Sequence, residues 1–252
     1  MTKDISAYDE PLYYEVAFSF IDSKKQIDFF EKISNKWGVN KINHFLDVAC
    51  GPSIQAEEIL KRGYKVTLVD LNSKMIKYVK KKYPQAESIT ANMKKFKINK
   101  KADFAFIMMG SLSYVGKSED LFEHLNFMGK NLNKGGLYFI ENYRLDYNPK
   151  VLFSSSSWTM KKGNIKVKTT YKIEKLNMLN QELLEKMKLE VNDNGKKRII
   201  EEKVVTTQIF PQQFKFIVEK QGDFELLGFY KHFKLNKLKE VSQFNHILLR
   251  KK

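Results

Sequence analysis

The first half of the chain alternates short apolar runs with segments of helical pattern, and this order limits the fold more than any other feature. Runs that are short and apolar enough to be buried strands lie at residues 44–49, 65–70, 88–91, 104–108 and 137–141. Segments with helical spacing or helix-capping residues lie at 54–62, 73–82 and 118–132. Strands that alternate with helices in this way predict an α/β fold built on a parallel sheet.

The second half follows a different pattern. Between residues 158 and 210 polar and apolar residues alternate as in strands, most clearly at 165–171, 184–191 and 199–209. The last two of these runs are joined by Asn192-Asp193-Asn194-Gly195, a strong signal for a hairpin turn. We therefore expect an antiparallel meander inserted into the α/β domain.

After the meander, a helix at 211–221 and strands at 224–230 and 244–250 are expected to complete the sheet. The predicted fold is α/β: a Rossmann-like, seven-stranded, mostly parallel sheet with helices on both faces, plus the inserted antiparallel β meander.

The composition excludes several classes of protein. The single cysteine, Cys50, rules out a disulfide framework and a cysteine-based zinc site, and the four histidines lack ligand spacing, so no metal is expected. No apolar stretch approaches the roughly 20 residues that span a bilayer. The amino terminus lacks the apolar core of a signal peptide. A cytoplasmic protein without a membrane partner is therefore expected.

The charge is unusual. Lysine and arginine number 45 against 29 acidic residues, which gives a net charge of +16, and the surplus is nearly all lysine. Such a surplus fits a lysine-rich solvated surface, or attraction to a polyanion or an anionic substrate. Arginine, the usual reader of phosphate and guanine, is scarce here.

Two acidic residues at the ends of neighbouring strands indicate a ligand site. Asp47 is followed by a tight turn through Gly51 that opens the next helix, so backbone N–H groups face outward there. Asp70 ends the following strand, where a carboxylate can accept both hydroxyls of an adenosine ribose. The turn contains one glycine instead of the G-x-G-x-x-G that a pyrophosphate requires. A nucleoside ligand without phosphates therefore fits better than a nicotinamide dinucleotide.

These segments resemble the motifs of the class I S-adenosylmethionine (SAM)-dependent methyltransferases. The similar motifs lie, in order, at residues 47–53, 69–72, 91–93, 108–114 and 133–136. The meander, the segment 210–250 and the N-terminal tyrosines Tyr8, Tyr13 and Tyr14 resemble one branch of that family. This branch is the small-molecule methyltransferases that include amino-sugar N,N-dimethyltransferases.

The resemblance implies SAM as the cofactor and S-adenosyl-L-homocysteine as its product. It implies cofactor contacts for Tyr14, Asp47, Ala49, Cys50, Gly51, Ser53, Asp70, Leu71, Met75, Asn92, Met93, Met109 and Gly110. It implies catalytic or substrate-side roles for Tyr114 and Tyr14. Glu141 is a further catalytic candidate, because it ends the fifth strand beside the expected active-site face. Two positions depart from the family pattern, because Ser53 stands where glycine is usual and Asn92 stands where aspartate is usual.

On this basis residues 1–150 are expected to form the SAM-binding core. Residues 151–210 are expected to cover the substrate or to form a dimer interface, and 211–252 to complete the sheet. The predicted function is methyl transfer from SAM to a nitrogen or oxygen of a small molecule, with an anionic acceptor and a homodimer both compatible with the sequence. The alternatives are a nucleic-acid (RNA) methyltransferase and a catalytically inactive methyltransferase-like binding protein.

Overall fold

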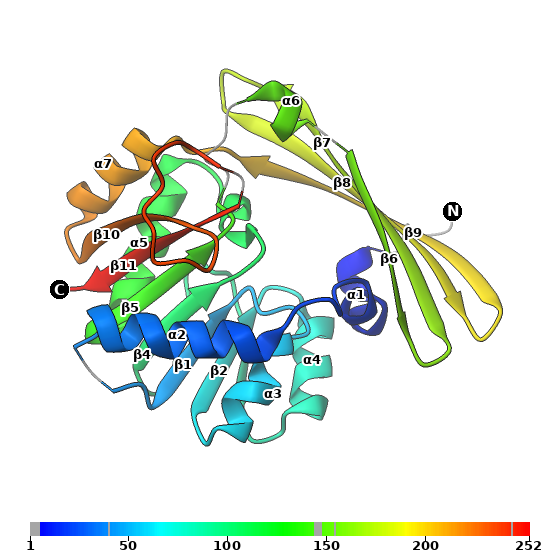
Figure 1. Ribbon diagram of the computed structural model, residues 1–252, viewed down its shortest axis with the longest axis horizontal. Helices are drawn as coiled ribbons and strands as arrows, with labels where there is room; N and C mark the ends of the chain where they lie inside the picture. Colours follow the sequence, from blue (N-terminus) through cyan, green and yellow to red (C-terminus); the bar gives the residue numbers. More distant parts are fainter. Residues whose placement is uncertain (1–5, 40, 144–147, 154, 243) are drawn as a thin grey trace.

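A seven-stranded sheet forms the centre of the computed structural model, which describes residues 6–39, 41–143, 148–153, 155–242 and 244–252. Its strands lie in the order β10-β11-β5-β4-β1-β2-β3 (Figure 1). Their bounds are β1 (His44–Val48), β2 (Lys65–Asp70), β3 (Glu87–Thr90), β4 (Ala102–Ile107), β5 (Leu132–Glu141), β10 (Phe224–Lys231) and β11 (Asn245–Lys251). Strands β1 to β5 pair in parallel, and β11 runs antiparallel to both β5 and β10. The predicted seven-stranded, mostly parallel sheet is confirmed.

Helices cover both faces of this sheet. The bounds are α2 (Ser23–Trp37), α3 (Ile54–Lys61) and α4 (Ser73–Lys82) on one face, and α5 (Ser118–Asn131) and α7 (Pro211–Gln221) on the other. Alternate residues of β4 show the division, because Phe104 and Phe106 pack in the cluster that contains α2, whereas Ala105 and Ile107 pack with α5 and α7. Burial on both faces explains why the strands are continuous apolar runs.

The predicted meander is a separate four-stranded antiparallel sheet, inserted in the chain between β5 and α7. It consists of β6 (Ser155–Lys162), β7 (Ile165–Asn177), β8 (Glu182–Asp193) and β9 (Lys196–Thr207), preceded by the short helix α6 (Pro149–Leu152). Asn194 and Gly195 both have positive φ, 50° and 85°, at the β8–β9 turn, as a two-residue hairpin requires. Strand β6 begins before residue 158 and adds a fourth strand to the three predicted runs.

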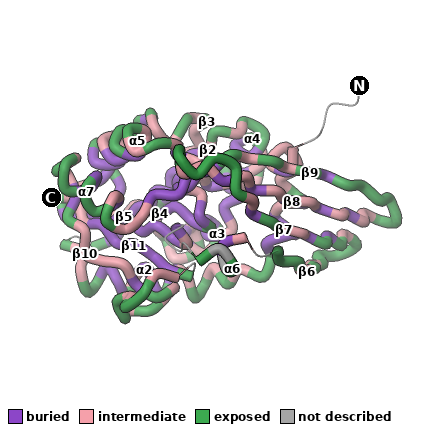
Figure 2. Tube along the Cα trace, turned by 90° about the horizontal axis from the view of Figure 1, so that it is seen from above, coloured by how far each residue is buried: buried purple, intermediate pink, exposed green. Residues whose placement is uncertain are grey.

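The amino-terminal segment packs against this second sheet. It comprises the 3-10 turn η1 (Ala7–Asp9) and the helix α1 (Pro11–Ala17), which Figure 1 shows beneath the meander. Val16 and Ala17 are buried against Val167 and Leu189 of the sheet's inner face. The indole N–H of Trp158 donates to the Ala17 carbonyl oxygen at 2.7 Å, which satisfies a group at the end of the helix. Figure 2 shows that the outer ends of the meander stay exposed.

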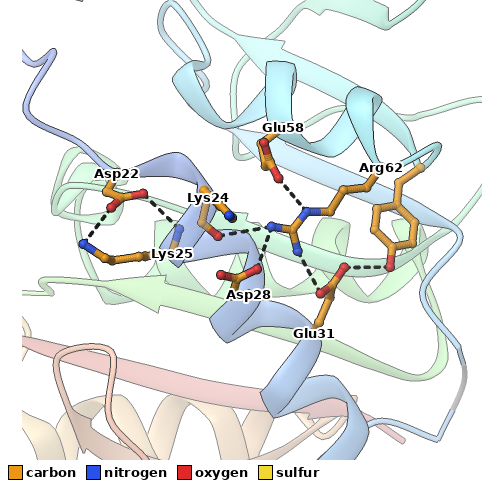
Figure 3. Close-up of polar contacts among 8 residues, drawn as sticks. Asp22, Lys24, Lys25, Asp28, Glu31, Glu58 and Arg62 are labelled. Atoms are coloured by element: carbon orange, nitrogen blue, oxygen red, sulfur yellow. Dashed lines mark hydrogen bonds and ion pairs between the residues drawn. The ribbon is translucent and has the colours of Figure 1, made fainter.

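One partly buried guanidinium links helix α2 to the end of α3. Arg62, whose side chain is 18% exposed, donates to Glu58, Glu31 and Asp28 at 2.6–2.8 Å (Figure 3). Burial opposes its charge, but these three carboxylates outweigh burial and raise the pKa of the guanidinium. Among the described residues, no helix is long and apolar enough to cross a membrane.

Candidate active site

The turn after β1 has an unusual backbone. Ala49, Gly51 and Ser53 all have left-handed φ values of 54°, 51° and 45°. Two of these three are not glycine, and such a conformation persists only where surrounding contacts enforce it. A β-carbon added to Gly51 would meet nothing within 4 Å, so this turn borders open space. The residues of the first predicted motif therefore form an open backbone cradle.

Asp70 lies across this cradle at the end of β2. Its two carboxylate oxygens accept the backbone N–H groups of Gly51 and Asn72, each at 2.8 Å. Burial raises the pKa of Asp70, and these two hydrogen bonds oppose the shift. The predicted proximity of the first two strand ends is thus present, with the Asp70 carboxylate beside the glycine of the turn.

Asp47 is buried under the same turn. The Ser53 hydroxyl donates to its carboxylate at 2.6 Å, so the serine that replaces the usual glycine braces Asp47. Burial raises the pKa of Asp47 to about 8, the Ser53 hydrogen bond lowers it, and the neighbouring Asp70 raises it. A cation placed beside Asp47 would favour its ionised form and lower this pKa. The ammonium group of an amino-acid ligand is of the right charge.

Four other residues predicted to contact the cofactor, Leu71, Met75, Asn92 and Met93, lie in different environments. Met75 is a core residue with 1% exposure, whereas Leu71 is 68% exposed and Asn92 is also exposed. The Asn92 side-chain oxygen accepts the backbone N–H of Lys94 at 2.9 Å, which shapes the loop after β3. The Met93 carbonyl oxygen bonds to the Nδ1 of buried His124 at 2.9 Å.

Cys50 packs among core residues of the face that carries α2, so it contributes its backbone to the turn. Its backbone N–H donates to the Val69 carbonyl oxygen at 3.0 Å. Burial raises the pKa of the Cys50 thiol well above its ordinary value, and Asp47 and Asp70 add to the shift. The thiol therefore stays protonated and does not serve as a nucleophile.

A large cavity lies between the two sheets, with a volume of about 740 Å³. Five of the residues predicted for the site line it: Tyr14, Met109, Gly110, Tyr114 and Glu141. The other predicted residues lie outside its lining: Asp47, Ala49, Cys50, Gly51, Ser53, Asp70, Leu71, Met75, Asn92 and Met93. The structure thus places five predicted residues in the cavity and those of the first motif in the cradle, while Leu71, Met75, Asn92 and Met93 belong to neither.

The amino-terminal segment joins these two parts. Asp9 of η1 accepts from the side chains of Asn72 and Lys74, both at 2.9 Å, beside the Asp70 turn. Tyr8 of the same turn packs against Tyr14 with ring centroids 5.6 Å apart, and both rings line the cavity.

Hydroxyl groups in the cavity converge on one glutamate of the meander. The Tyr114 and Tyr171 hydroxyls donate to Glu185 at 3.0 and 2.6 Å, and the Tyr8 hydroxyl lies 3.0 Å from that of Tyr114. Burial raises the pKa values of Tyr8, Tyr14 and Tyr114, which keeps these phenols protonated at neutral pH. They can donate hydrogen bonds but cannot act as bases.

Glu141, at the end of β5, is engaged by the chain itself. The Met109 backbone N–H donates to its Oε2 at 2.7 Å, and the His232 Nε2 lies 2.6 Å from its Oε1. Glu141 is buried, whereas the His232 side chain is 33% exposed and lines the cavity. In the part of the chain that is described, no three His, Cys, Asp or Glu residues gather so as to hold a metal ion.

Sequence reasoning missed the cavity residues that come from distant segments. Tyr171, Glu185 and Glu202 lie on the meander, and His232 follows β10. A signal for one of them was present, because Glu185 interrupts the apolar inner face that Leu183 and Met187 mark on β8. No comparable signal exists for His232, whose position depends on the packing of β10 against β11.

The comparisons with known proteins agree with this architecture. Residues 45–136 match the family model described as a methyltransferase domain. Over 96 residues the chain is 26% identical to the dTDP-3-amino-3,4,6-trideoxy-alpha-D-glucopyranose N,N-dimethyltransferase of Streptomyces venezuelae. That alignment spans 38% of this chain and 40% of the relative, less than half of its length.

Two solved structures are similar over nearly the whole chain. Streptomyces venezuelae DesVI has a TM-score of 0.79 at 16% identity, covering 96% of this chain and 97% of its own. An S-adenosylmethionine-dependent methyltransferase from Clostridium acetobutylicum has a TM-score of 0.77 at 17% identity, covering 95% and 96%. At these identities the likeness concerns the fold, meander included. Residues 45–136 of the chain therefore match a methyltransferase domain, and the chain as a whole shares its fold with these two structures, one of which is an S-adenosylmethionine-dependent methyltransferase.

Proposed function

We propose that the chain transfers a methyl group from SAM to a nitrogen atom of a small-molecule amine. In this proposal the cradle after β1 and the Asp70 carboxylate hold the adenosyl part, with Asp70 accepting the ribose hydroxyls. Asp47, directly or through water, offsets the ammonium group of the methionine part. The remaining cofactor contacts are proposed for Tyr14, Ala49, Cys50, Gly51, Ser53, Leu71, Met75, Asn92, Met93, Met109 and Gly110.

The observation that carries the proposal is the junction between the cradle and the cavity. Tyr14 lines the cavity and packs against Tyr8 of η1, and Asp9 of the same η1 accepts from Asn72 beside Asp70. Met109 and Gly110 line the cavity from the end of β4. SAM supplies an electrophilic methyl group on a sulfonium. The residues of the chain need mainly to align the acceptor with that group, and such positioning supplies much of the rate in a displacement of this kind.

Nitrogen as the acceptor atom is supported by the charges of the cavity. The acidic members of its lining are Asp22, Glu141, Glu185 and Glu202, and the basic members are Lys25 and His232. Within a chain of net charge +16, this acidic lining favours an amine over the anionic acceptor that the composition suggested. The relative named above is an N,N-dimethyltransferase of an amino sugar, which supports a small molecule rather than nucleic acid.

The test has two stages. Titration calorimetry should detect binding of SAM and of S-adenosylhomocysteine, and failure of both to bind would contradict the proposal. Mass spectrometry should then detect methyl transfer to at least one of three amines, each tested beside its hydroxyl counterpart: glucosamine, 3-amino-3-deoxyglucose and dTDP-3-amino-3,4,6-trideoxy-α-D-glucose. Transfer to the hydroxyl compounds or to an RNA oligonucleotide, with none to the amines, would also contradict it.

A further inference from the structure

Strained backbone gathers around the pair formed by Glu141 and His232. Three residues with left-handed φ adjoin it: Met109 (56°), Asn142 (49°) and Phe233 (46°). Met109 donates its N–H to Glu141, Asn142 follows Glu141 in the chain, and Phe233 follows His232. For a bulky residue such as phenylalanine this conformation is a genuine outlier. Backbone strain of this kind clusters at functional sites, so the Glu141–His232 pair is a candidate for a functional role.

The hydrogen bond fixes which nitrogen of His232 carries the proton. A carboxylate oxygen only accepts, so the 2.6 Å contact assigns the proton to Nε2 of His232. In the neutral ring Nδ1 then holds a lone pair. The second oxygen of Glu141 accepts the Met109 N–H, so the carboxylate cannot turn away without losing that bond. A histidine held by a carboxylate in this way is poised to accept a proton.

We propose that His232 is a catalytic residue, the proton acceptor for the substrate amine, and that Glu141 is the positioning residue that orients it. The inference rests on the proposed function and adds the residue that accepts the proton from the substrate ammonium group. His232 lines the cavity together with Met109 and Gly110, which form the loop at the end of β4. The proton acceptor therefore lies on the wall that this loop forms.

The proton balance of the reaction shows why such a group is useful. An aliphatic amine is mostly an ammonium ion at neutral pH and has no lone pair until it loses a proton. His232 takes that proton at Nδ1, and Glu141 offsets the positive charge that forms on the ring. The nitrogen lone pair then forms the bond to the methyl carbon, and the carbon–sulfur bond breaks with its electron pair remaining on sulfur. The methylated ammonium product retains the positive charge until it is released.

Other charged groups face the same space and set the background for this titration. The acidic and basic residues that line the cavity with His232 are Glu141 of β5, Asp22 and Lys25 at the start of α2, Glu185 of β8 and Glu202 of β9. His246 of β11 is buried outside this lining. Burial and the neighbouring His232 lower the pKa of His246 to about 3, so that ring stays neutral. Asp22 and Lys25 pair with each other at 2.8 Å. Glu141 is thus the charged partner in direct contact with His232.

The experiment compares His232→Gln with the parent protein on the three amino sugars named above. The variant should lose about 100-fold in kcat, a typical contribution of a general base, with KM and the Kd for SAM within about twofold. Imidazole added to His232→Ala should restore part of the lost rate. His44→Gln is the matched control and should keep the parent rate. His44 lies at the amino-terminal end of β1, where it contacts Thr67.

Glu141→Gln tests the positioning role separately. It should lower kcat about tenfold and move the acidic limb of the kcat–pH profile to lower pH, because a protonated ring loses its counter-charge. A merely structural role for Glu141 would leave the position of that limb unchanged and would overturn this part of the proposal.

The outcomes distinguish the inference from the proposed function. If the parent methylates an amine and His232→Gln stays within threefold of it, His232 is not the proton acceptor, while the proposed function stands. If the parent binds SAM but methylates none of the amines, both proposals fail together. A large loss in kcat without rescue by imidazole, combined with a raised Kd for SAM, also overturns the inference, since it indicates a misfolded site.

Discussion

The Gly51 backbone N–H donates to the Asp70 carboxylate at 2.8 Å, so the turn after β1 and the end of β2 are joined by a charged hydrogen bond. If Asp70 holds the ribose of SAM, Asp70→Ala should weaken SAM binding by about 1.5–3 kcal/mol, the scale of hydrogen bonds to a charged group. Titration calorimetry measures this directly.

A control separates cofactor binding from damage to the fold. Asp103→Ala removes a carboxylate at the amino-terminal end of β4, where it accepts the Asn43 backbone N–H at 2.9 Å. This variant should leave SAM affinity unchanged. An unaltered Kd in Asp70→Ala, measured on a folded protein, would show that Asp70 does not hold the ribose.

The pKa of Asp47 predicts how the stability of the cofactor-free protein depends on pH. Burial raises this pKa to about 8 from an ordinary value of 3.8, so the folded state keeps a proton that the unfolded state releases. The free energy of unfolding should therefore fall as the pH rises from about 4 to 8. Asp47→Asn removes the ionisation and should be more stable than the parent at pH 9, by about 5 kcal/mol, the free-energy equivalent of that pKa shift.

Urea denaturation at pH 5 and pH 9 in the absence of SAM checks this. The two proteins should differ little at pH 5, where the parent Asp47 is protonated. Denaturation curves that keep the same separation at both pH values would mean that Asp47 does not ionise in this range.

Local spacing explains why part of the site was predictable from the sequence. Asp47 and Asp70 lie at the ends of neighbouring parallel strands, and the pairing of Val48 with Val69 brings the following loops together. This proximity depends only on the pairing of β1 with β2. The helices of the α/β core were also predictable, because their apolar spacing and capping residues lie within each segment.

Distant packing explains why the rest was not predictable. Helix α1 buries Val16 against a sheet formed some 150 residues later, so its own seven residues give little evidence of a helix. His232 meets Glu141 only because β11 lies between β10 and β5, a neighbourhood that no local pattern encodes. Glu141 was singled out as a substrate contact, yet both of its oxygens bond within the chain.

Tyr114 offers a test of the substrate side of the cavity. Its hydroxyl donates to Glu185 and lies 3.0 Å from the hydroxyl of Tyr8. Tyr114→Phe removes both contacts and leaves the ring that lines the cavity in place. We expect kcat to fall about tenfold, the equivalent of one hydrogen bond of about 1.4 kcal/mol, while SAM affinity is retained.

Steady-state kinetics with the best of the three amines provide the measurement. Tyr64→Phe is the matched control, because the Tyr64 hydroxyl donates to Glu31 in the ionic cluster around Arg62, outside the cavity lining. Equal turnover in Tyr114→Phe and the parent would mean that the Tyr114 hydroxyl does not contribute to the reaction.

Glu15, next to Tyr14 in the chain, links helix α1 to helix α4 and strand β6. It is 4% exposed and accepts from Lys82 of α4 at 2.8 Å and from Lys162 of β6 at 2.7 Å. Burial raises its pKa, but hydrogen bonds from Lys162, Lys82 and Tyr78 outweigh burial and lower the pKa below its ordinary value of 4.5. The stability that Glu15 contributes is thus present above this ordinary value and is lost as the pH falls below it.

Glu15→Gln leaves the two lysines without their counter-charge and should reduce the free energy of unfolding at pH 7 by about 1–3 kcal/mol. It should also weaken SAM binding, because α1 carries Tyr14 and holds η1 against the Asp70 turn. Glu219→Gln, which removes an exposed pair with Lys215 on α7, should change stability by less than about 0.5 kcal/mol. Since Glu15 becomes protonated in acid, the difference from the parent should shrink as the pH falls below 4.5. A difference that stays constant down to pH 3 would mean that the charge of Glu15 does not hold the amino-terminal segment in place.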